Sequence, residues 1–469
     1  MTSLPASVAA GHPSTAATGR DILLRGGSAA DAVAAMILAG CVSETLFTGL
    51  GGGGFATVYE ASTRRVHCLD FFVAVPGLDG TVPAPPRDIK VAFGDVDVPY
   101  AVGGPSVAVP GTPAGVAALH SAFGRLPWSQ IVGQARDLAA SGTPFPMQHA
   151  VLLPDVAAAM VLGDGVAVYS RPDGSGGRRH LGPGELLHHE GLADTLDDYL
   201  NQGPDALATG DRGRAFVAAV RADGGALSEL DMVAYQVHDL TVARVRFGPG
   251  VICVRDNDLD RFARTASILD DGLADADPTA RVRHLAHALR APAKRSETTT
   301  VVAVDDSGNA CAATHSLGLG SGIWYGGVHG NSMLGEGELL RGELSPGERM
   351  PSMMVPLVVT DPDGGLLFAG GAAGGSRIRP ALLQVLTRVL VDGRSPAEAV
   401  AAPRMTATPD AVHLEPGFPP EVIDALNDDG ESVVQWPEQR PFFGGVAVIG
   451  RDGPAADPRR GGLALRLRP

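Results

Sequence analysis

One helical stretch limits the fold of this chain more than any other feature. Residues 29–41 follow Ser28 and carry Asp31 in their first turn, which is the pattern of a capping box. The stretch is apolar almost all round, so a helix here has no face suited to water. We expect it to end near Gly40 and to lie buried. The chain therefore requires a layered fold that covers this helix on every side.

Strand signals surround this helix along the sequence. A β-branched, alternating segment at residues 298–304, a polar turn at 306–309 and a return segment at 311–316 together predict a hairpin. Further strands are expected at residues 55–60, 66–72, 242–254 and 355–360, and further helices at 114–123 and 128–141. Strand runs bracketed by helix runs favour an α+β layered fold over regular βαβ alternation.

Composition narrows the class of partner. The chain has 469 residues, of which 45% are hydrophobic and 19% charged, which is globular usage. Its formal net charge of −15 argues against nucleic acid and against an anionic membrane surface. There is no basic segment followed by an apolar signal core, and no apolar run long enough to span a membrane. We therefore expect a cytoplasmic protein that acts on a small molecule.

Several other motifs are interpreted as structural. The spacing of Gly49, Gly51 and Gly54 matches a dinucleotide-binding pattern, but helix precedes it and strand follows, so a tightly packed turn is the better interpretation. Residues 170–183 are expected to form a surface loop, as is the cluster at 188–190. The Asp-rich segment that ends at Asp277 is expected to be a solvated face. The four cysteines fit no metal spacing and are expected in the core.

The hairpin that begins at Thr298 offers a candidate catalytic nucleophile. A threonine hydroxyl alone is a poor nucleophile, but an N-terminal amine on the same residue can activate it. The pKa of such an amine is about 8 in model peptides, so the amine can accept the hydroxyl proton at neutral pH. A chain cut before Thr298 would carry nucleophile and base on one residue. Three threonines that simply start a strand remain the alternative on local grounds.

Several motifs along the chain bear on the choice between a catalytic Thr298 and a purely structural one. Residues 26–32 (GGSAADA), 48–55 (TGLGGGGF) and 106–112 (SVAVPGT) resemble GGNAVDA, SGIGGGGF and SVGVPGT of the γ-glutamyltranspeptidase family, a family of N-terminal nucleophile hydrolases. Residues 374–378 (GGSRI) and 457–459 (DPR) resemble its C-terminal motifs. The resemblance runs from near Val8 to the C-terminal end of the chain.

The resemblance implies an enzyme with a defined fold and nucleophile. Thr298 matches the first Thr of the family's TTHYSVVD motif, so the precursor is expected to cut itself between Glu297 and Thr298. Subunits 1–297 and 298–469 would stay associated without a covalent link, as one four-layer αββα sandwich, and a higher oligomer is allowed. The implied catalytic groups are the nucleophile, two assisting hydroxyls and two oxyanion-hole glycines, which are Thr298, Thr314, Ser316, Gly374 and Gly375. No metal or organic cofactor is implied.

The departures from the family pattern concern substrate binding. Family members hold the glutamyl α-carboxylate with an Arg, where this chain has Phe72, and the α-amino group with an Asp, where it has Gly335. Gly318 replaces an Asn, and Met353 replaces one of two paired serines. Loss of a bidentate Arg contact to a carboxylate is hard to compensate with a phenyl ring. The candidate substrate-binding residues are Phe72, Ser332, Gly335, Glu336, Ser352 and Arg377.

These matches and departures together favour an autoprocessed hydrolase of a non-standard acyl substrate, with Phe72 in an apolar acyl pocket and a role in secondary metabolism. Three alternatives stay open. One is ordinary γ-glutamyl hydrolysis or transfer, with a clamp rebuilt around Glu336. Another is C–C bond hydrolysis of an oxo-acid side chain in alkylproline-type antibiotic biosynthesis, a reaction attributed to some relatives. The last is a non-catalytic, unprocessed descendant.

Overall fold

The apolar helix lies at the centre of the structure. The computed structural model describes residues 4–93, 96–273, 277–290, 298–337, 339–340 and 343–468. Helix α2, Ala29–Ser43, is buried along its whole length, as predicted, and ends three residues beyond Gly40. Its capping box is also confirmed, because the Ser28 hydroxyl accepts from the Asp31 amide and the Asp31 carboxylate accepts from the Ser28 amide.

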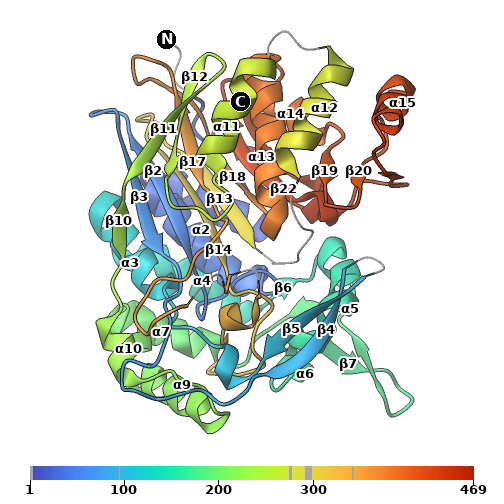
Figure 1. Cartoon of the computed structure of the whole chain (residues 1–469). Helices are drawn as coiled ribbons and strands as arrows, with labels where there is room; N and C mark the ends of the chain where they lie inside the picture. Colours follow the sequence, from blue (N-terminus) through green and yellow to red (C-terminus); the bar gives the residue numbers. More distant parts are fainter. Residues whose placement is uncertain are drawn as a thin grey trace.

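The first sheet contains the predicted hairpin. β13 (Thr299–Val304) and β14 (Ala310–Ser316) pair antiparallel, with Thr300 opposite Thr314. The strand order of the sheet is β10 (His238–Leu240), β3 (Arg65–Phe71), β2 (Gly53–Glu60), β14, β13, β1 (Ser7–Ala10) and β24 (Leu463–Arg466). The hairpin therefore lies in the middle of the sheet, between strands from the N-terminal part of the chain (Figure 1).

A second sheet packs against the first. Its order is β11 (Val242–Phe247), β12 (Gly250–Arg255), β17 (Leu357–Thr360), β18 (Leu366–Ala373), β22 (Gly445–Gly450) and β23 (Gly453–Ala456). Val302 and Val304 of β13 meet Val358 and Ala369 in one apolar cluster between the sheets. The alternate residues of β13 point the other way, into the core beneath α2.

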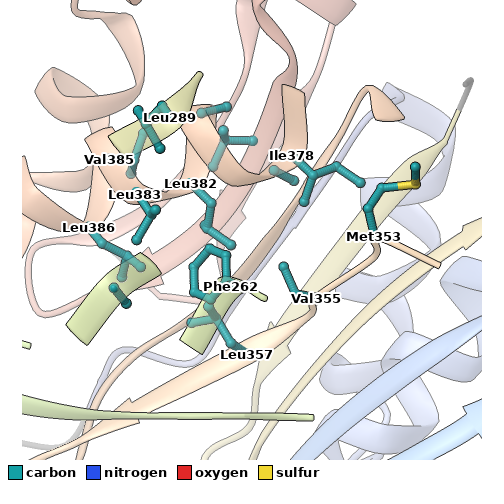
Figure 2. Close-up of a cluster of buried hydrophobic side chains, with 14 of the residues drawn as sticks. Phe262, Leu289, Met353, Val355, Leu357, Ile378, Leu382, Leu383, Val385 and Leu386 are labelled. Carbon is teal, nitrogen blue, oxygen red and sulfur yellow. The ribbon is translucent and has the colours of Figure 1, made fainter. Parts of the chain in front are cut away.

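Helices cover both outer faces. α1 (Pro13–Leu24), α2, α3 (Thr112–Phe123) and α4 (Trp128–Ser141) cover the first sheet, and α11 (Phe262–Leu273), α12 (Pro278–Leu289) and α13 (Ile378–Leu386) cover the second (Figure 1). Figure 2 shows part of the outer core on the second side, in which Phe262 lies between Leu357 and Leu382. This arrangement of helix, sheet, sheet and helix confirms the predicted four-layer αββα fold.

Smaller elements complete the chain. Beside the sandwich, the hairpin β4 (Arg87–Phe93) and β5 (Val96–Val102) packs on α5 (Met147–Met160). The remaining helices are α6 (Gly165–Tyr169), α7 (Leu192–Gln202), α8 (Asp205–Ala208), α9 (Asp211–Ala222), α10 (Glu229–Ala234), α14 (Pro396–Ala401) and α15 (Pro420–Asp428). The remaining strands are β6 (Thr143–Pro144), β7 (Ser170–Pro172), β8 (Arg178–His180), β9 (Leu186–Leu187), β15 (Trp324–Tyr325), β16 (Val328–His329), β19 (Met405–Ala407), β20 (Val412–Leu414) and β21 (Val433–Gln435).

Three local predictions need correction. The expected loop at 170–183 contains the hairpin β7–β8, which the Arg178 side chain braces by donating to Ser170 Oγ at 2.7 Å. His189 is not on a surface loop but buried, with Nε2 3.1 Å from Thr45 Oγ1. Asp258, in the segment expected to be solvated, is buried because its carboxylate accepts from the Phe262 amide at the start of α11.

Two other structural interpretations, of the cysteines and of the glycine run, are confirmed. All four cysteines are buried and free. The glycine run is tightly packed, since a Cβ on Gly51 would overlap the His329 carbonyl and one on Gly52 the Ser316 carbonyl. Across the ranges described, no helix is both long enough and apolar enough to cross a membrane.

Candidate active site

The two faces of β13 distinguish the three threonines at its start. Thr300 faces the second sheet, where its Oγ1 lies 3.2 Å from Thr314 Oγ1. Thr299 faces the helices and donates to Glu44 Oε2 at 2.5 Å. Thr298 directly precedes the strand, so by alternation it falls on the same side as Thr300. Of the three, Thr298 is therefore the one at the strand end that shares a face with the hydroxyls of β14.

The predicted assisting hydroxyls lie on that same face. Continuing the β13–β14 register by one residue beyond the Thr299–His315 pair brings Thr298 opposite Ser316, on the same face as the Thr300–Thr314 pair. Ser316 Oγ accepts a hydrogen bond from the Gly318 amide at 2.9 Å, which fixes the turn after β14. All of these residues are buried, and Thr298 itself is 2% exposed. The structure thus brings together the three predicted hydroxyl residues.

The two predicted oxyanion glycines form the turn after β18. Gly374 has φ +122° and Gly375 φ +58°, conformations that favour glycine. A Cβ on Gly374 would lie 3.4 Å from Arg460 Nη2. The second terminal nitrogen of this guanidinium group, Nη1, donates to the Thr298 carbonyl oxygen at 3.1 Å. Arg460 therefore bonds to the candidate nucleophile residue and lies beside the glycine turn.

Phe72 is placed in the core rather than on an open surface. It lies just after β3, is 1% exposed, and stacks on Phe55 with ring centroids 5.5 Å apart. The guanidinium carbon of Arg255 lies 3.9 Å from the Phe55 ring centroid on this cluster, and burial lowers the pKa of Arg255 to about 10. The same guanidinium donates to the Met354 carbonyl at 2.8 Å. The position of the family's Arg is therefore filled by a closed aromatic cluster.

Gly335 has no room for a side chain, because a Cβ would overlap the Ala101 carbonyl oxygen. Its neighbour Glu336 is buried and accepts from Tyr100 Oη at 3.0 Å, while the same hydroxyl lies 2.7 Å from Ser332 Oγ. Burial and the Glu336 charge raise the pKa of Tyr100 well above its ordinary value. A Cβ on Gly318 would lie 2.6 Å from Glu336 Oε1. The Glu336 carboxylate thus occupies space that a side chain at residue 318 would need.

The remaining predicted substrate residues are also buried. Ser352 Oγ accepts from the Met354 amide at 3.2 Å, and Met353 lies at the edge of the outer core, on the side of Ile378 (Figure 2). Arg377 donates to Ser376 Oγ at 2.6 Å, and its guanidinium carbon is 4.4 Å from the Phe442 ring centroid. Glu297 lies outside the described residues.

Two charged residues beside the candidate nucleophile were not predicted from the sequence. Glu44 caps the end of α2, and Arg460 follows the DPR motif. The signal for Glu44 was an acid directly after an almost entirely apolar helix, because such a position implies a buried charge with a specific partner. Within the described part of the chain, no group of three or more His, Cys, Asp or Glu side chains is arranged to hold a metal ion.

Comparison with known proteins agrees with these features. The family model described as Gamma-glutamyltranspeptidase matches residues 15–253 and 261–467. The acylase ACY 1 proenzyme of Pseudomonas sp. (strain SE83) is 26% identical over 94% of this chain and 89% of its own length. Glutathione hydrolase 5 proenzyme of Rattus norvegicus is 27% identical over 98% of this chain and 92% of its own. The cephalosporin acylase of Bacillus halodurans shares the fold, with a TM-score of 0.81, 21% identity and coverage of 99% and 96%.

Proposed function

The chain belongs to the γ-glutamyltranspeptidase family of N-terminal nucleophile hydrolases, and from this premise we propose that it is an autoprocessed acyl hydrolase with Thr298 as nucleophile. Its precursor cuts itself between Glu297 and Thr298 into subunits 1–297 and 298–469. The proposal is supported by the face that Thr298 shares with Thr314 and by Arg460, which donates to the Thr298 carbonyl and lies beside the Gly374 turn.

The strand order supports association of the two subunits after the cut. In the first sheet, β14 of the small subunit pairs with β2 of the large one, and β1 of the large subunit lies between β13 and β24 of the small one. In the second sheet, β12 pairs with β17 across the same division. Separation would expose these backbone groups and the apolar layer between the sheets, which is costly.

In the proposed reaction, the Thr298 hydroxyl oxygen attacks the acyl carbon while the Thr298 amine takes the hydroxyl proton. The bond to the leaving amine breaks, and that amine receives the proton. The amide groups at Gly374 and Gly375 stabilise the negative oxygen that forms in between, a role for which one lost donor costs about 2.7–4 kcal/mol. Water then attacks the ester, which releases the acid and frees the Thr298 hydroxyl.

We infer the substrate class from the two positions, 72 and 335, at which this chain lacks the family's glutamyl-binding side chains. Phe72 is stacked in a closed cluster where the family has an Arg, and the backbone of Ala101 excludes any side chain at Gly335 where it has an Asp. The zwitterionic α-amino acid end of a glutamyl substrate would be transferred out of water and would find no charged partner at residue 72 or at residue 335. We therefore assign an acyl group that lacks this end. A biosynthetic role in secondary metabolism, rather than glutathione turnover, is consistent with that substrate.

One observation favours a second candidate. The buried Glu336 carboxylate lies where a side chain at residue 318 would otherwise be, close to Ser316. A carboxylate here would suit an ammonium group, as ordinary γ-glutamyl hydrolysis with a rebuilt clamp requires. Its existing bond to Tyr100 is the argument against that use.

Three p-nitroanilides with the same five-carbon acyl chain separate the candidates. The γ-glutamyl compound carries an amino and a carboxyl group, the glutaryl compound only the carboxyl group, and the pentanoyl compound neither. We expect kcat/KM to be highest for pentanoyl and about 10-fold or more lower for γ-glutamyl. A preference for γ-glutamyl that disappears in Glu336→Gln would instead establish the rebuilt clamp.

A further inference from the structure

We propose that Glu44 and Arg460 are positioning residues that hold the Thr298–Thr299 segment from two sides, so that the nucleophile keeps its place after the chain is cut. The inference rests on the proposed role of Thr298. It concerns two residues that lie outside the hydroxyl pair and the glycine turn described above.

Arg460 holds the nucleophile through its backbone. Its Nη1 donates to the Thr298 carbonyl oxygen at 3.1 Å, and the side chain is buried. The guanidinium carbon lies 4.9 Å from the ring centroid of Phe47, and the aliphatic part of the side chain passes Gly445, where a Cβ would overlap it. These contacts restrict the guanidinium to one place beside the start of β13.

Glu44 holds the next residue from the helix side of the sheet. Its Oε2 accepts from Thr299 Oγ1 at 2.5 Å, and its Oε1 accepts from Thr15 Oγ1 at 2.8 Å. Burial raises the pKa of Glu44, and the two hydroxyls and the nearby Arg460 charge act against that rise. The turn at Gly11 closes over this contact, because a Cβ there would overlap Glu44 Oε2 and lie 2.9 Å from Thr299 Oγ1.

Cleavage before Thr298 is the reason why the Thr298–Thr299 segment has to be fixed in place. Cleavage turns the start of β13 into a chain terminus, and termini fray unless they are tied down. A nucleophile displaced by about 1 Å can lose about 100-fold in rate. Thr298 cannot be held through its own hydroxyl or amine, since both react. Its carbonyl and the Thr299 side chain are the nearest groups free for that purpose, and these are the groups that Arg460 and Glu44 bind.

The test uses variants that alter this hold without touching Thr298. Thr299→Val keeps the β-branched shape and removes the hydroxyl, and Thr299→Ser returns it. Arg460→Lys keeps the charge and loses the planar fork. Gly11→Ala displaces the Glu44 carboxylate without removing any polar group. Thr195→Val is the matched control, because Thr195 is buried and its hydroxyl donates to the Gly326 carbonyl, away from β13.

Each full-length precursor is followed on denaturing gels for the rate of splitting, and each processed form is assayed with pentanoyl-p-nitroanilide. We expect Thr299→Val, Arg460→Lys and Gly11→Ala to lower kcat by about 10- to 100-fold with KM within about 2-fold. Thr299→Ser is expected to restore most of kcat. Thr195→Val is expected to lower the melting temperature but not kcat.

Equal loss of melting temperature in Thr299→Val and Thr195→Val, with kcat unchanged in both, would overturn the positioning role. So would a loss of kcat that Thr299→Ser does not restore. The proposed function fails by a different result, namely a small subunit whose N-terminal residue is not Thr298. N-terminal sequencing of the wild-type small subunit therefore separates the two failures.

Discussion

The Asp305 carboxylate accepts a hydrogen bond from the Ala29 amide at 3.1 Å, which ties the turn of the β13–β14 hairpin to the first residue of the buried helix. The same carboxylate accepts from the amides of Ser307 and Asn309 within the turn. Negative charge at a helix N-terminus is favourable, and Asp31 adds a second carboxylate there. One side chain thus aligns the β13–β14 hairpin with the helix behind it.

We expect Asp305→Ala to lower the free energy of unfolding by about 1–3 kcal/mol, because the buried Ala29 amide and the part-buried turn amides lose their acceptor. Urea unfolding measures the change. Asp306→Ala is the control, since Asp306 is exposed and should stay within about 0.5 kcal/mol of wild type. Equal effects of the two substitutions would contradict the role given to Asp305.

Thr298→Ala is expected to leave a single full-length band, because the nucleophile of the proposed cleavage is gone. Thr298→Ser should still split, more slowly, since it keeps the hydroxyl. Denaturing gels and intact mass give the result. If Thr298→Ala still yields two chains of wild-type mass, another residue starts the reaction. A wild-type protein that never splits and hydrolyses none of the three p-nitroanilides would favour the unprocessed, non-catalytic alternative.

Gly335→Ala is expected to destabilise the fold by about 1–3 kcal/mol, because its Cβ would overlap the Ala101 carbonyl oxygen, and backbone cannot swing aside as a side chain can. Gly337→Ala, two residues on, meets nothing within 4 Å and should be neutral. Thermal unfolding compares the two. Gly335→Asp should not restore γ-glutamyl turnover, and a gain of that activity would refute the argument that this position is closed.

Acid sensitivity is expected from His189. Burial lowers its pKa from 6.5 to about 4, so between these values the unfolded chain binds a proton that the folded protein does not. The free energy of unfolding therefore falls as the pH drops from about 6.5 towards 4, by up to about 1.4 kcal/mol per pH unit from this residue. His189→Gln should remove that share of the slope in urea titrations. An unchanged slope in His189→Gln would contradict this origin of the acid sensitivity.

Local patterns were sufficient for the central elements of the fold. The capping box and unbroken apolar run of α2 act within a few residues, as do the β-branched strands and polar turn of the β13–β14 hairpin. The crowding of the glycine run also followed from its sequence, because adjacent glycines permit close backbone approach.

Partners distant in sequence explain what the sequence did not predict. His189 is buried because Thr45 and Tyr169 meet it in a chain of hydroxyl contacts. Asp258 differs, because it caps a helix that begins only four residues later, a local signal that the sequence interpretation missed. The roles of Glu44 and Arg460 depend on contacts with Thr299 and Thr298 that span 255 and 162 residues. No local period or motif encodes such a meeting, since only the packed layers create it.

The place of β1 in the first sheet sets an order of events. This strand of residues 7–10 is flanked on both sides by strands from beyond residue 298. Produced separately, the two segments would each present open strand edges, which invite wrong pairings. Folding of the continuous chain has to come first, and scission second. The peptide bond that is later cleaved therefore keeps both segments in one chain while the sheets form. Each strand can then pair with its native neighbour before the chain is divided.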